Sequence, residues 1–323
     1  MNRLIIFLLV AMMAFGCAKQ PPKQTDTQQT QDAPPSKPVD IPVFDGTTAY
    51  NFLTAQTDFG PRNPGSEGHL NCLNYLQSEF DKYADSVTIQ PFTVSGYGGE
   101  VLKLTNVLAS FNPHAAKRVL LIAHWDTRPR SDQDKNPKNK DKPILGANDG
   151  ASGVAVLLEI ARNAKLSPPP IGLDLLCVDG EDYGKEGDLN YYLLGAKYFT
   201  KNMPPGYSPI FGILLDMIGD KELSIKKERY SLQDAPDIVN LVWSTANELG
   251  YGQFSDDLQG WVTDDHLPFD DAGIKTIDLI DFEYPDASNR FWHTQEDTPD
   301  KCSAESLEAV GRVITTVIYR QTM

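Results

Sequence analysis

The sequence contains few cysteines, and none of them stands in a CxxC pair. Only four cysteines occur among 323 residues, whereas thiolate-bound zinc sites are built on closely spaced cysteines, so a site of that kind is excluded. If Cys17 is modified, Cys72, Cys177 and Cys302 remain, which allows at most one disulfide and one free thiol. Cys177 lies in an apolar run and is predicted to be a core residue.

Positive charge is also scarce. The chain has 29 Lys and Arg residues against 44 Asp and Glu residues, a net charge of -15. Nucleic-acid binding depends on clustered basic side chains, so no nucleic-acid partner is expected. An acidic protein suits a cationic substrate such as a peptide amino terminus, although solubility alone is the simpler explanation of the charge.

Apolar runs long enough to span a membrane are missing, and the amino-terminal run is too short. Residues 4–15 are apolar, follow Arg3 and end in Ala-Phe-Gly-Cys at 14–17. This pattern resembles a bacterial lipoprotein signal, in which the cysteine becomes the lipidated first residue. We expect a signal peptide over 1–16 and a lipid on Cys17. The protein would then be anchored in the inner or outer membrane of a bacterial cell envelope, facing the periplasm. An ordinary secretory signal is the alternative.

A polar segment separates this signal from the rest of the chain. Residues 17–42 are rich in Gln, Pro, Lys and Thr and cannot bury a core, so a disordered tether is predicted. Residues 43–323 show no linker-like break and no internal repeat, and 41% of the whole chain is hydrophobic. A single domain with a large core is predicted over this range.

Apolar runs alternate with helical patterns along this domain. Strands are predicted over 101–111, 118–124, 172–178, 212–216 and 276–280. Helices are predicted over 47–57, 67–83, 153–164, 192–201, 235–249 and 304–320, the last capped by Ser303. The alternation predicts an α/β fold with a mixed, mostly parallel central sheet and helices on both faces. Sites in such sheets gather at the carboxyl ends of the strands.

Histidine and acidic residues follow several of these runs. His124 and Asp126 are two apart at a predicted strand end, so both side chains can face one site. The histidine can bind a metal that the aspartate helps to orient, and a buried, satisfied histidine is an equal alternative. Asp149 stands among small residues before a predicted helix. Taken alone it is favoured as an N-cap, with a metal ligand as the alternative.

A denser acidic cluster follows the predicted strand 172–178. Asp179, Glu181 and Asp182 place three carboxylates within four residues. So much charge at a buried strand end is costly unless a cation or a shared proton compensates it; a solvated turn is the alternative. Further candidate residues stand at or near later apolar runs: Asp216, Asp264, Trp292 and His293.

This set of side chains matches the requirements of a zinc enzyme. Zinc binds His nitrogen and Asp or Glu oxygen in a tetrahedral site, and a catalytic site keeps one position open. A carboxylate that lies beside the metal without binding it can act as a general base. Because Glu181 and Asp182 are neighbours, one can bind the metal while the other transfers protons.

In their order and spacing, the motifs resemble the M28-type zinc aminopeptidase superfamily and, within it, the glutaminyl cyclases. The resemblance covers residues 58–320 and includes Phe59–Ser66, similar to the family's GPR-x-PGS segment. Trp292 and the Asp-Asp-His-x-Pro-Phe segment at 264–269 look like the cyclases, because aminopeptidases tend to have Tyr and Ser-Asp-His there. The resemblance implies a zinc exopeptidase-like (phosphorylase/hydrolase-like) fold.

The resemblance also implies roles for individual residues. Three would bind zinc: Asp149, Asp182 and His293. Three would serve catalysis, the first as general acid/base: Glu181, Asp216 and Asp264. Three would belong to the substrate-binding set: Trp292, His124 and Asp126. One Zn²⁺ per chain is implied for a cyclase. In the two-zinc aminopeptidases, positions like His124 and Asp216 hold a second zinc and Asp149 bridges.

Two positions depart from the family pattern. Asp182 stands where the cyclases have Glu, and its side chain is one methylene shorter, so its loop must lie closer to the metal. Animal cyclases carry a second pocket tryptophan shortly after this motif, and none occurs near Gly187. The segment 183–192 is a candidate replacement.

The implied reaction is cyclisation of an amino-terminal glutamine to pyroglutamate with release of ammonia. The substrates would be peptides or proteins that begin with glutamine. One alternative is a two-zinc aminopeptidase that hydrolyses amino-terminal residues, and another is a non-catalytic lipoprotein that binds peptides.

Overall fold

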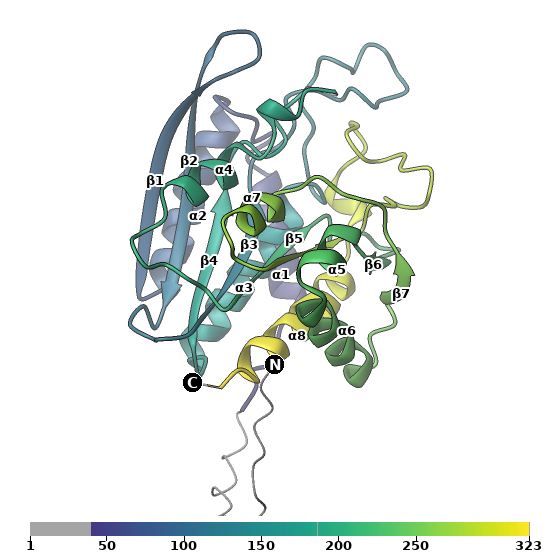
Figure 1. Ribbon diagram of the computed structural model, residues 1–323. Coiled ribbons are helices and arrows are strands. Elements are labelled where there is room, and N and C mark those ends of the chain that lie inside the picture. Colours follow the sequence, from purple (N-terminus) through teal and green to yellow (C-terminus); the bar gives the residue numbers. More distant parts are fainter. Residues whose placement is uncertain (1–39, 186, 323) are drawn as a thin grey trace, which may run out of the picture. The chain divides into compact units, whose positions relative to one another are not determined.

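The structure is a computed structural model, and it describes residues 40–185 and 187–322 (Figure 1). The predicted signal peptide, Cys17 and most of the predicted tether lie outside these residues. Among the described residues, no helix has the length and apolar character needed to cross a membrane. The described residues belong to one compact unit.

A six-stranded sheet forms the centre of this unit, in the order β1-β2-β4-β3-β5-β8. Its strands are β1 (Ser86–Ser95), β2 (Val101–Phe111), β3 (Arg118–His124), β4 (Gly172–Val178), β5 (Phe211–Asp216) and β8 (Thr276–Ile280). β3 pairs in parallel with β4 and β5, and β5 pairs in parallel with β8. β1–β2 and β2–β4 are antiparallel. The prediction of a mixed, mostly parallel sheet is confirmed.

Helices cover both faces of the sheet (Figure 1). Successive side chains of a strand point to opposite faces of the sheet, so alternate residues of β3 contact the helices on each face. Val119 and Leu121 pack into the larger core cluster with five helices, whereas Leu120 and Ile122 pack with two others. The five are α1 (Gly46–Thr57), α2 (Glu67–Tyr83), α3 (Ala151–Leu166), α6 (Pro236–Leu249) and α8 (Ala304–Tyr319). The two are α4 (Leu194–Lys201) and α7 (His266–Asp271).

The sequence patterns missed the edge strand β1, whose side chains are mostly exposed or half-buried, and the short elements. The helix α5 (Arg229–Asp234) and the small parallel sheet of β6 (Ile225–Lys227) and β7 (Phe254–Leu258) are too short to show a period. The other long elements lie close to their predicted bounds. Ser303 caps α8 as predicted, accepting a hydrogen bond from the Ser306 backbone N–H at 3.1 Å.

The three described cysteines are all buried and free. Cys177 is a core residue on β4, as its apolar surroundings predicted. No disulfide therefore constrains the described part of the chain, and its core is held by packing.

Candidate active site

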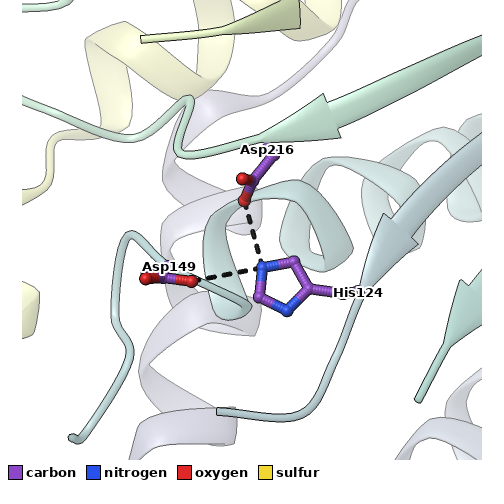
Figure 2. Close-up of side chains that lie close together, drawn as sticks. All are labelled: His124, Asp149 and Asp216. Atoms are coloured by element: carbon purple, nitrogen blue, oxygen red, sulfur yellow. Dashed lines mark hydrogen bonds and ion pairs between the residues drawn. The ribbon is translucent and has the colours of Figure 1, made fainter. Parts of the chain in front are cut away.

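Two adjacent parallel strands bring a histidine and an aspartate together, beside Asp149 from the loop before α3. His124 is the last residue of β3 and Asp216 is the last residue of β5. His124 Nε2 lies 3.0 Å from Asp216 Oδ1 and 3.3 Å from Asp149 Oδ1 (Figure 2). The convergence follows from parallel pairing, which puts the carboxyl ends of these strands at one edge of the sheet.

A second group shares Asp149 with the first. His293 Nε2 lies 3.4 Å from Asp149 Oδ2 and 3.3 Å from Asp182 Oδ2. Both oxygens are buried and have no hydrogen-bond partner among the described residues. A buried carboxylate oxygen without a donor is costly, so these atoms fit a bound cation. One imidazole and two carboxylates are ligands that zinc accepts.

The loop before α3 holds Asp149 in place. Arg62 is fully buried, and its guanidinium donates to the backbone carbonyls of Leu145 and Gly146 at 2.9 and 2.7 Å. The Asp149 backbone N–H donates to Asp297 Oδ2 at 3.2 Å. The N-cap interpretation of Asp149 is wrong: the helix begins after Gly150, and no side chain caps it. At Gly150 φ is +108°, which any other residue would adopt only under strain.

Arg128 holds the carboxylate of Asp182 in place. Its Nη1 donates to Asp182 Oδ1 at 2.6 Å, while Nε and Nη2 donate to Asp132 at 2.8 and 2.6 Å. Oδ1 is thus occupied, and Oδ2 is left facing His293. Burial raises the pKa of Asp182, but His293 and Arg128 outweigh it and hold that pKa well below its usual range. Sequence reasoning missed Arg128, because a lone arginine four residues after His124 carries no signal of its partner.

Glu181 lies beside these ligands without bonding to them. Its backbone N–H donates to Asp126 Oδ1 at 3.0 Å, and Gly180 before it has φ +76°. Burial raises the pKa of the Glu181 carboxyl well above its ordinary value, and the neighbouring Asp182 and Asp264 raise it further. A carboxyl with a raised pKa is suited to accepting and returning a proton near neutral pH.

The loop that carries His293 is strained. His293 has φ +53°, a region that non-glycine residues rarely occupy, and Met217, directly after Asp216, has φ +49°. Such conformations persist where the surrounding structure fixes them, and they cluster at functional sites. The Trp292 ring stacks on the His293 ring, with 3.7 Å between the ring centroids. It meets the Phe282 ring edge-on, with 5.1 Å between the centroids.

A pocket of about 560 Å³ opens over this cluster. Seven of the nine predicted site residues in the described part of the chain line it: Asp149, Glu181, Asp182, Asp216, Asp264, Trp292 and His293. Apolar side chains line it as well: Leu189, Met217, Trp261, Val262, Ile280 and Phe282. It therefore combines an acidic floor with apolar and aromatic walls.

His124 and Asp126, the other two predicted site residues, do not line the pocket. Both are buried, and Asp126 has no exposed surface. Asp126 acts through the Glu181 backbone, and His124 through Asp149 and Asp216. We expected both residues to belong to the substrate-binding set, but they lie behind the side chains that line the pocket. A position at a strand end does not reveal which neighbouring side chains will cover it.

The fold and the pocket define a zinc-dependent α/β enzyme, and comparison with known proteins gives its family. Residues 106–318 match the model of peptidase family M28, and the chain belongs to that family. It is 42% identical to glutaminyl cyclase of Bacteroides thetaiotaomicron, whose crystal structure was solved with N-acetylhistamine. That match has a TM-score of 0.84 and covers 88% of this chain and 100% of the other.

Two further relatives show the range of names in the family. A mouse glutaminyl-peptide cyclotransferase-like protein is 29% identical over 78% of this chain and 70% of its own length. A structure named leucine aminopeptidase precursor, also from Bacteroides thetaiotaomicron, is 43% identical with a TM-score of 0.84, covering 88% of this chain and 100% of the other. The curated relatives and several of the solved structures carry the cyclase name, so the comparisons support the cyclase over the aminopeptidase.

Proposed function

We propose that this enzyme is a glutaminyl-peptide cyclotransferase, which converts amino-terminal glutamine to pyroglutamate and releases ammonia. The observation that carries the proposal is the position of Glu181. It is a buried carboxyl with a raised pKa, next to a candidate metal triad but not bonded to it, in a pocket walled by Trp292.

Asp149, Asp182 and His293 would hold one zinc ion, which supplies Lewis-acid polarisation of the glutamine γ-carbonyl when bound. Arg128 orients Asp182 for this role, and Asp297 and Arg62 fix the loop of Asp149. The acidic floor also attracts the cationic amino terminus of the substrate.

Glu181 would move the proton. The substrate α-nitrogen attacks the γ-carbonyl carbon, and the bond from that carbon to the amide nitrogen breaks. Glu181 accepts a proton from the attacking amine and delivers it to the leaving nitrogen, which departs as ammonia. Asp264 lines the pocket nearby, and burial, with Asp216 and Asp265, raises its pKa well above the ordinary value. A neutral Asp264 can donate a hydrogen bond to Glu181 and so support its charged form.

Trp292 would hold the glutamine side chain. Its ring is fixed by stacking on His293 and by Phe282, so little conformational freedom is lost on binding. Keeping the amine close to the amide is the enzyme's main task, because the nucleophile belongs to the substrate.

One zinc per chain is supported by the difference between the two triads that share Asp149. His124 Nε2 and Asp216 Oδ1 are hydrogen-bonded to each other, so this pair is satisfied without a cation. In the other triad, Asp149 Oδ2 and Asp182 Oδ2 lack a hydrogen-bond partner within the described residues. A two-zinc aminopeptidase would have to break the first pair.

We also propose that a lipid on Cys17 anchors the enzyme in the bacterial cell envelope, facing the periplasm. Support comes from the signal-like residues 1–17 and the polar segment that follows them. Mass spectrometry of the mature protein tests this proposal. A lipid on Cys17, absent in Cys17→Ser, is the expected result, and an unmodified amino terminus would contradict it.

The function is tested with a coupled ammonia assay on a glutamine-initiated dipeptide. We expect ammonia release that a chelator abolishes and added zinc restores. Hydrolysis of an amino-acid anilide is measured in parallel on the same preparation. Anilide cleavage without ammonia release would establish the aminopeptidase instead, and binding without either reaction would indicate a non-catalytic protein.

A further inference from the structure

Two large apolar side chains at the pocket face solvent instead of the core. Trp261 is 53% exposed and Leu189 is 60% exposed, and both line the pocket above the acidic floor. Isolated exposed apolar residues are common on protein surfaces, but apolar side chains gathered at a pocket mark a binding surface.

The backbone on both sides of Trp261 is held by hydrogen bonds. Gln259 N–H donates to the Lys227 carbonyl at 2.9 Å. Val262 N–H donates to Oε1 of the fully buried Glu228 at 3.1 Å. A loop tied at these two points presents its central side chain in a fixed position, so ordering it on binding costs little.

The indole itself is also supported from the protein side. The Tyr230 ring meets it edge-on, with 4.7 Å between the centroids, and the Arg229 guanidinium lies 5.9 Å from it. Because 53% of Trp261 remains exposed despite these contacts, a large part of it is free to meet a ligand. Trp292, in contrast, is partly buried against His293 and Phe282.

We infer that Trp261, with Leu189, binds the side chain of the second substrate residue and favours a large apolar or aromatic one. This inference rests on the proposed function. Ring closure joins the α-amine to the γ-carbonyl, so both groups must lie at the acidic floor. The only remaining substituent of that α-carbon besides hydrogen is the carbonyl that leads to the second residue. The peptide therefore leaves the pocket towards its exposed apolar rim.

Trp261 supplies a second pocket tryptophan, although none occurs near Gly187, where the animal cyclases carry theirs. The segment 183–192 supplies Leu189 and Tyr192 to the pocket, whereas Tyr183 packs outside it against Tyr97. Trp261 comes from a different loop, between β7 and α7, and reaches the same pocket. An aromatic wall supplied by that loop contacts the substrate residue after the glutamine.

The experiment compares Gln-Phe-amide with Gln-Gly-amide as substrates of wild-type enzyme and Trp261→Ala. We expect wild type to prefer Gln-Phe-amide through a lower KM. In the variant, KM for Gln-Phe-amide should rise about tenfold, against at most about twofold for Gln-Gly-amide, because loss of aromatic contact and buried area is worth about one decade. Trp261→Phe should recover most of the preference.

Two leucines provide a matched control. Leu189 lines the pocket, while Leu258 is similarly exposed, at 58%, on β7 and does not line it. Leu189→Ala should raise KM for Gln-Phe-amide roughly threefold. Leu258→Ala should leave the kinetics of both substrates unchanged.

Equal losses of Trp261→Ala on both substrates, or no loss on either, would overturn the inference. Failure of the proposed function is recognised separately, because wild type would then release no ammonia from either peptide. In that case, calorimetry of the same two peptides decides the matter. Tighter binding of Gln-Phe-amide that Trp261→Ala abolishes would support the binding role, and equal affinities would refute it.

Discussion

The two ends of strands β3 and β4 each carry a buried aspartate paired with an arginine, and the two aspartates differ in how completely they are satisfied. Near the amino-terminal end, Asp174 Oδ1 accepts from Ser110 and Arg118 at 2.7 and 2.9 Å. Its Oδ2 accepts from Arg118 and from Tyr207, the latter at 2.8 Å. Both oxygens are fully used by the protein.

Just beyond the carboxyl-terminal end, Asp182 is bonded through one oxygen only. Oδ1 accepts from Arg128 at 2.6 Å, and Oδ2, which lies 3.3 Å from His293 Nε2, has no hydrogen-bond partner in the part of the chain that the structure describes. Natural proteins rarely leave buried polar atoms unpaired. An aspartate whose two oxygens are both hydrogen-bonded within the protein stabilises the fold. An aspartate in a pocket with one oxygen left without a hydrogen bond indicates the position of a ligand.

The largest expected effect is a difference in zinc binding between variants of the two histidines of the site, His293 and His124. His293→Ala should abolish zinc binding and ammonia release, because it removes the only imidazole of the triad with unpaired oxygens. His124→Ala should retain one zinc per chain, since His124 Nε2 is already hydrogen-bonded to Asp216 and His124 is not one of the three proposed ligands. Metal analysis of both purified variants checks this expectation. Loss of the same zinc from both would contradict the distinction between the triads.

Glu181→Gln should lower kcat for ammonia release by about 10²–10⁴-fold, the usual contribution of a general acid/base. The amide is nearly the same size, so zinc content should stay at the wild-type level. Zinc analysis and the coupled assay on one preparation measure both quantities. Wild-type turnover in this variant would refute the role given to Glu181.

The arginines of these two pairs, Arg128 and Arg118, give the next largest contrast. Arg128→Met should weaken zinc binding roughly 10–100-fold, as loss of a group that orients a metal ligand does. Arg118→Met should cost roughly 3 kcal/mol of folding free energy and leave zinc affinity unchanged. Competition with a chelator measures the affinity, and urea unfolding measures the stability.

The Arg128 pair also has a pH signature in the zinc-free protein. Because the pKa of Asp182 is lower in the folded state, its stabilising contribution is fully present above the unfolded pKa of about 3.9 and is lost as pH falls through the lowered value. Arg128→Met should reduce this acid-dependent part of the folding free energy. Unchanged zinc affinity in Arg128→Met would show that Asp182 is oriented by other groups.

The smallest effect is expected at the satisfied end of the strands. Ser110→Ala removes one of the hydrogen bonds to Asp174 and should cost about 1 kcal/mol of folding free energy. Ammonia release and zinc content should not change, which urea unfolding and the coupled assay together establish. A loss of activity here would show that the two ends are coupled.

The sequence predicted the long helices and five of the six strands of the central sheet, because periodicity is a local property, but it missed the mostly exposed edge strand β1. It also singled out the acidic residues and the histidine that line the pocket, because they follow apolar runs or stand close to them. It could not show that Arg128 would meet Asp182, since 54 residues separate them. It also placed His124 and Asp126 in the substrate-binding set, because burial behind other side chains depends on the whole fold. Trp261 was missed because its loop has no periodic pattern and a lone tryptophan carries no signal of its neighbours.

Titration of zinc into the metal-free enzyme tests the central claim most directly, with ammonia release from a glutamine-initiated dipeptide as the readout. The structure predicts that activity reaches its maximum at one equivalent of zinc, bound by Asp149, Asp182 and His293. Activity that appears only with a second equivalent, or free glutamine as the product in place of ammonia and pyroglutamate, would contradict it.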